Sequence, residues 1–170
     1  MSTPDPPYDV KYRPTTLDVA VFIKNRTVDS NNNFLGDFTE ETIVTGDEVN
    51  HIIDEAAPLV LSALRWDPTA DPPSIPEDNT PAVQTLVALL SAIFTEVTKF
   101  SEQIARQVSP YPYLKELFDG MLSQKQAELG IVSGSGGKTG MTIIDLYLLQ
   151  YKGAVYAFPD DPMVNWKTAF

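Results

Sequence analysis

The sequence contains no cysteine, only one histidine and no long uninterrupted apolar run. The absence of cysteine excludes disulfides, thiolate metal sites and cysteine nucleophiles, and a reducing cytoplasm is the simplest setting for such a chain. The N-terminal residues lack the basic and apolar regions of a signal peptide, and no stretch approaches the roughly 18 apolar residues of a membrane span. We therefore expect no export by a signal peptide and no insertion into a membrane.

Basic residues are scarce as well. Twelve Lys and Arg stand against 23 Asp and Glu in 170 residues, which gives a net charge of −11. This charge repels a phosphate backbone, so tight general binding of nucleic acid is not expected. An acidic surface can nevertheless line a passage through which DNA moves without adhering. Hydrophobic residues make up 43% of the chain, which is enough for one core.

The N-terminal third predicts an arm, a short helix and a loop. Residues 1–14 are rich in proline and poor in apolar side chains, which indicates an extended N-terminal arm. Thr15 or Thr16 can cap a first helix over about 16–26. The Asn- and Gly-containing residues 27–44 then favour an ordered loop or a small β-hairpin.

A second helix follows this loop. Thr45 and Glu48 have the spacing of a capping box, and apolar residues recur with helical periodicity as far as Arg65. Pro58 lies within this helix, where it removes a backbone hydrogen bond and clashes with the preceding turn. The sequence therefore predicts a kink or break near this proline.

Two further helices complete the predicted domain. The proline-rich residues 66–80 predict a surface connection, and Thr-Pro at 80–81 opens a third helix of roughly 25 residues. Ser-Pro at 109–110 opens a fourth helix, which ends at Gly130. The fold class that this pattern predicts is all-α, with a bundle of about four helices over residues 15–130.

Candidate catalytic or ligand-binding residues are few. The segment 136–139 resembles the end of a phosphate-binding loop, but Val132 stands where the first glycine is required, and we interpret the segment as a flexible linker. His51 has acidic neighbours at helical spacing, which is more typical of a solvated helix face than of a catalytic site.

One stretch matches part of a calcium-binding loop. Phe34 stands where that loop requires a glycine, and Asn-rich turns recur for backbone reasons alone, so a structural turn is the preferred interpretation. We expect no enzyme activity, no cofactor and no metal. The residues that match the calcium pattern are Asp29, Asn31, Asn33 and Glu40.

Residues 131–170 begin with a glycine-rich linker and continue as an apolar, aromatic tail. These apolar residues either fold back on their own bundle or dock on another subunit, for instance by adding a strand to its sheet. We favour docking on another subunit because the linker gives the tail reach. The predicted interaction residues are Tyr147, Tyr151, Tyr156, Phe158, Trp166 and Phe170 in the tail, with Tyr8 and Tyr12 in the arm.

Several motifs occur in a fixed order: Asn-Arg-Thr after the first helix, DSNNN with a following Gly and Phe-Thr, a Thr-Gly-Asp-Glu-Val helix start, SPYPYLKELFDGML, and a closing AFPDDPM. In this order they resemble the head-to-tail adaptor, or connector, proteins of long-tailed phages, especially phages of actinobacterial hosts. The resemblance covers residues 15–122 and, loosely, the tail. The long connection at 66–80 and the long tail depart from shorter members of that family.

The resemblance implies a structural virion protein that forms a homo-oligomeric ring, usually of twelve copies, in the phage neck. Such a ring joins the portal protein to a stopper or tail-terminator protein, and DNA passes through it without sequence-specific binding. The subunit would be in the host cytoplasm during assembly and would contact no membrane. The alternative from another class is a small, acidic, monomeric binding or regulatory module that occupies a basic surface on a target protein.

Overall fold

The computed structural model describes residues 8–131, which form an all-α fold. The predicted fold class is confirmed: this part of the chain contains five α-helices and three short 3-10 helices, and no β-strand. The helices are α1 (Thr16–Ala20), α2 (Gly46–Ala63), α3 (Thr80–Lys99), α4 (Ser101–Ala105) and α5 (Tyr111–Glu128).

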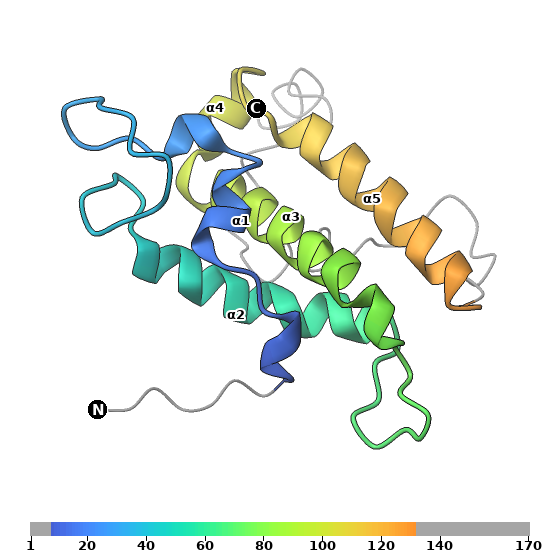
Figure 1. Ribbon diagram of the computed structural model, residues 1–170. Helices are drawn as coiled ribbons and strands as arrows, with labels where there is room; N and C mark the ends of the chain where they lie inside the picture. The colour runs from blue at the N-terminus through green and yellow to red at the C-terminus, as the bar shows by residue number, and fades with distance from the viewer. Residues whose placement is uncertain (1–7, 132–170) are drawn as a thin grey trace, which may run out of the picture.

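Helix α3 is the centre of the bundle. It packs against α2 on one side and α5 on another, while α1 crosses it (Figure 1). Nearly every side chain from Leu86 to Val97 is buried, as expected of a helix that is apolar around its whole circumference. The stretch Glu77–Lys99 is long and apolar enough to cross a membrane, but 72% of its most apolar window is buried inside the protein. Its apolar character is explained by its place in the core.

The start of α2 forms as predicted. The Thr45 hydroxyl accepts a hydrogen bond from the Glu48 amide at 3.3 Å, and the Glu48 carboxylate accepts one from the Thr45 amide at 2.9 Å. These two bonds satisfy amides that have no partner within the helix. Of the kink or break predicted near Pro58, the break does not occur, because α2 continues from Gly46 to Ala63 with the proline inside it.

Two predicted helices are too long. The helix expected over 16–26 is α1 followed by a separate 3-10 helix, Lys24–Arg26. The third helix ends at Lys99 because Phe100 leaves helical geometry, with φ −128° and ψ 29°, and α4 follows. The apolar periodicity of the sequence continues past the end of α1 and past the end of α3. It therefore did not reveal where the backbone leaves each helix.

The prediction of an extended N-terminal arm is wrong for residues 8–14. The segment contains a 3-10 helix, Val10–Tyr12, and packs on α3. Tyr8 and Tyr12 are only 6% and 1% exposed, and the Tyr12 ring meets the Trp66 ring edge-on with 6.1 Å between centroids. These two tyrosines are therefore core residues of the domain and not available as contacts for a partner. The two tyrosines that suggested an arm for binding partners instead stabilise the bundle.

The segment between α1 and α2 is an ordered loop without paired strands. Two isolated antiparallel bridges, Val28 with Phe34 and Asp29 with Thr42, hold it together. The Asp29 carboxylate also accepts hydrogen bonds from two backbone amides and one side-chain amide within the turn. Of the predicted alternatives, the ordered loop is the one that forms.

Candidate interaction surface

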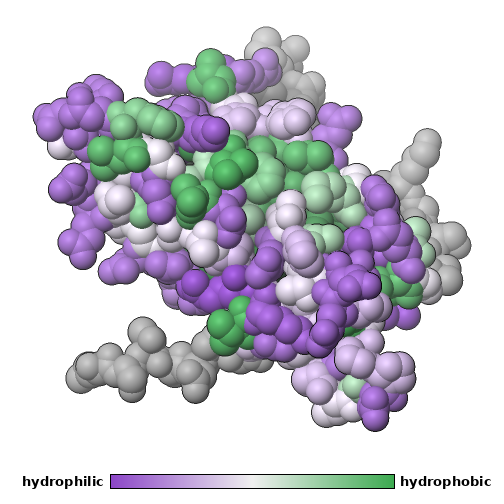
Figure 2. All heavy atoms as spheres, in the orientation of Figure 1, coloured by the Kyte–Doolittle hydropathy of each residue, from purple (hydrophilic) through white to green (hydrophobic). Residues whose placement is uncertain are grey.

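Helix α1 exposes two apolar side chains next to a groove. Leu17 and Val21 are 53% and 58% exposed, one helical turn apart, while Val19 and Ala20 face the core. Figure 2 shows apolar residues gathered over the middle of this face, where Figure 1 places α1 and α3. The adjoining groove has a volume of about 340 Å³, and we call it the α1 groove. It is lined by Asp18, Val21, Phe22, Pro81, Gln84, Thr85 and Ala88.

The loop before α2 presents a second set of apolar side chains. Phe34 and Ile43 are each 58% exposed and Leu35 is 38% exposed; we call these three the loop group. Hydrogen bonds from the Leu35 amide to the Thr27 carbonyl at 2.8 Å, and from the Ile43 amide to the Val28 carbonyl at 2.9 Å, fix their backbone. Because the loop is held by its own hydrogen bonds, these side chains are displayed in a defined arrangement.

The outer side of α5 is the third apolar surface. Tyr113 is 66% exposed, and Leu117 and Met121 lie on the same side at intervals of four residues. With Glu116, Gly120 and Gln124 they line a shallow groove, which we call the α5 outer face.

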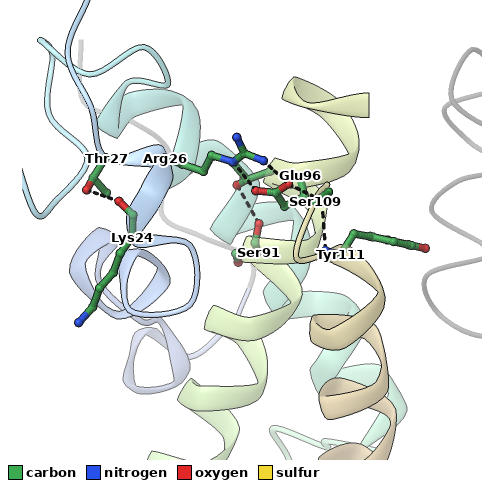
Figure 3. A network of polar contacts seen from close by, with 8 residues as sticks. Lys24, Arg26, Thr27, Ser91, Glu96, Ser109 and Tyr111 are labelled. Carbon is green, nitrogen blue, oxygen red and sulfur yellow. Dashed lines mark hydrogen bonds and ion pairs between the residues drawn. The ribbon is translucent and has the colours of Figure 1, made fainter. Parts of the chain in front are cut away.

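A buried ion pair fixes the base of the loop to the core (Figure 3). The Arg26 guanidinium donates two hydrogen bonds to the Glu96 carboxylate, at 2.6 and 2.8 Å, and lies 3.8 Å from the centroid of the Phe100 ring. The Ser109 hydroxyl donates to the same carboxylate at 2.6 Å and accepts from the Tyr111 amide at 3.1 Å. The network therefore ties together the loop, the end of α3 and the start of α5.

Sequence reasoning did not identify this pair. Glu96 is the only acidic residue in α3, within a run of buried apolar side chains, and such a carboxylate requires a cationic partner. That signal was present, but Arg26 lies 70 positions away and nothing local indicates it.

A second polar cluster holds the N-terminal segment to α2. The Tyr8 hydroxyl donates to the Asp54 carboxylate at 2.6 Å, and the Arg13 guanidinium donates to it at 2.9 Å. Burial, together with the hydrogen bond to Asp54, raises the pKa of Tyr8 above its ordinary value. Burial alone would raise the pKa of Asp54, but hydrogen bonds from Arg13 and Tyr8 outweigh it and leave that pKa below its ordinary value. The cluster thus stabilises a neutral tyrosine beside an ionised aspartate.

The other candidate ligand residues do not form a site in the described part of the chain. In residues 8–131, no three His, Asp or Glu side chains converge on a point that could hold a metal ion. The carboxylate of Asp29 is used by its own turn, and His51 is exposed with a nitrogen 3.4 Å from Glu55.

The predicted tail contacts lie outside the described residues, as do residues 1–7 and the phosphate-loop-like segment 136–139. The tail residues concerned are Tyr147, Tyr151, Tyr156, Phe158, Trp166 and Phe170.

Comparison with known protein families, curated proteins and solved structures finds no match to this chain. The fold and the surface define an acidic all-α domain with exposed apolar surfaces around a buried apolar core.

Proposed function

We propose that this protein is a structural assembly subunit that forms a homo-oligomeric ring in the neck of a long-tailed phage. The observation that carries the assembly role is the exposure of Val21, Phe34 and Ile43, each 58%, on backbone held by a helix cap, two bridges and a buried ion pair. Apolar side chains fixed in this way gain from burial against a partner at little cost in ordering.

The two apolar surfaces near α1 suit a repeated contact between copies. The loop group of one copy would pack into the α1 groove of the next, so that each subunit uses two different surfaces. A contact of this heterologous kind closes into a ring when the rotation between copies divides a full turn. Many modest interfaces then combine into one stable joint.

The location and partners of the ring rest on the resemblance in sequence. It would contain twelve copies, join the portal protein to a stopper or tail-terminator protein, and line the DNA passage. The net charge of −11 supports this role, because an acidic wall repels the DNA backbone and allows it to slide. The aromatic residues of the tail are proposed contacts with these partners or with a neighbouring subunit.

Electron microscopy of the protein, alone and mixed with purified portal protein from the same source, tests this proposal. We expect rings of this protein seated on the portal. A monodisperse monomer that ignores the portal would contradict the proposal and favour the alternative, a monomeric acidic module. Under that alternative the protein should instead bind strongly basic target proteins with an affinity that falls as salt is raised.

A further inference from the structure

Helix α5 carries one broad apolar stripe, and the bundle covers only part of its width. Leu114 and Phe118 are each 1% exposed where α5 packs against α3. Leu117 and Met121 are partly buried against the same core, and with the exposed Tyr113 they form the edge of the stripe that opens onto the α5 outer face. An apolar stripe that is wider than the surface covering it leaves an edge that can pack against a second partner.

Gly120 makes the middle of this face unusually easy to approach. It lies within α5, where glycine costs about 1 kcal/mol relative to alanine. A side chain at this position would meet no heavy atom within 4 Å, so the bundle itself does not require glycine there. The absence of a side chain at Gly120 leaves room for a second helix to come close to the α5 backbone.

The chain leaves α5 at the C-terminal end of the helix, beyond the last residue that lines this face. Gly130 has φ +67° and the Ile131 amide donates to the Gln126 carbonyl at 2.8 Å, which closes the helix and turns the backbone away from its axis. The next nine residues, 132–140, can span at most about 30 Å. That length is sufficient for the chain to return along α5.

Residues 141–151, MTIIDLYLLQY, carry one charged side chain and eight large apolar or aromatic ones. As a helix they would be about 16 Å long, at 1.5 Å per residue. The α5 outer face runs from Tyr113 to Gln124, which by the same rise is also about 16 Å. The two lengths therefore match.

We propose that in the free subunit residues 141–151 pack as a helix against the α5 outer face of the same chain. The short connection favours this occupant over a second copy, because it holds the segment at an effective concentration of about millimolar. A second copy would have to exceed that concentration to compete. The contact does not depend on ring formation, and it keeps the apolar segment covered until a partner is present.

Disulfide trapping in the full-length protein tests the contact, because the chain has no cysteine of its own to interfere. One variant carries Gly120→Cys with Leu146→Cys, which places one thiol near the middle of each element. Its control carries His51→Cys with Leu146→Cys, since His51 is exposed on α2. With oxidised glutathione we expect the first variant to form an intramolecular disulfide at least about tenfold faster than the control.

Non-reducing electrophoresis separates the outcomes. A cross-linked monomer supports the proposal, whereas a cross-linked dimer would assign the face to a second copy. Equal rates in the two variants would show that the segment does not dock on α5. Thermal unfolding of the reduced variants, compared with wild type, confirms that both are folded. Ring formation on the portal is scored in a separate experiment, so the proposal for the α5 outer face and the proposal of a ring can fail independently.

Discussion

Arg26 and Glu96 are the charged side chains of the described residues that lie in the buried interior. Isolated buried charges are strongly destabilising, but here the carboxylate receives two bonds from the guanidinium and one from Ser109. Either charge alone would destabilise the fold, whereas together they fix the position of the loop relative to α3 and α5.

Replacing Glu96 with alanine should lower the free energy of unfolding by about 3–5 kcal/mol, because it leaves the Arg26 charge buried without a partner. Urea denaturation measures the change. Lys115→Ala, which removes an exposed pair with Asp119, is the matched control and should cost less than about 1 kcal/mol. The double variant Arg26→Met and Glu96→Leu should recover most of this loss of stability. If Glu96→Ala alone lost as little stability as Lys115→Ala, the buried Arg26 charge would not need its partner.

Residue-level features were predictable from sequence where they are local. The capping box at Thr45 follows from residues three positions apart, and both of its hydrogen bonds form. The environments of Tyr8 and Tyr12 could not be predicted in the same way, because they depend on Asp54 and Trp66, which are remote in the chain. Proline-rich composition around the two tyrosines indicated an arm, and their tertiary contacts override it.

At the scale of elements, apolar periodicity correctly located α2, α3 and α5 and missed interruptions that periodicity does not encode. The chain leaves helical geometry at Phe100, whose ring stacks under Arg26. Pro58, in contrast, suggested a break in α2, but burial of the side chains on both sides of it holds the helix together. In each case tertiary packing decided the outcome over local preference.

Pro58→Ala should raise the free energy of unfolding, by up to about 3 kcal/mol, because alanine restores an amide donor and removes the ring clash inside α2. Thermal and urea unfolding both measure this gain. Pro81→Ala is the control: that proline lies in the first turn of α3, where an amide has no helical acceptor, so its effect should be much smaller. A net loss of stability at position 58 would show that α2 needs the bend that proline imposes.

At the scale of the whole molecule, the exposed apolar surfaces are the features most directly connected with assembly. Composition indicated partner contacts in the arm and the tail, but the two tyrosines of the arm are buried and the tail lies outside the described residues. The exposed apolar side chains that the structure describes include others at α1 and on the loop before α2. These could not be predicted, because a single exposed valine just after a five-residue helix has no sequence pattern that separates it from a core residue.

Val21→Glu should leave the unfolding temperature within about 2 °C of wild type, because the side chain is exposed and makes no contribution to the core. The same variant should form no rings on the portal, since a charge in the α1 groove would be buried at each contact between copies. Electron microscopy of the variant and the wild type side by side measures this. Asn25→Glu, at an exposed position on the neighbouring 3-10 helix, is the control, because it adds the same single negative charge. Rings lost equally in both variants would argue against a specific contact at Val21.

The central position of α3 also bears on how such a sequence can change through evolution. Helices α1, α2 and α5 pack against α3 from different directions, and α4 contacts its C-terminal end, so most substitutions in α3 disturb several neighbours at once. The proline-rich connection at 66–80, apart from Trp66 and the buried Ile75, has far fewer such constraints. Sequence drift in this fold should therefore accumulate around a nearly fixed middle helix, which allows related proteins to keep the same architecture after most of their recognisable similarity has been lost.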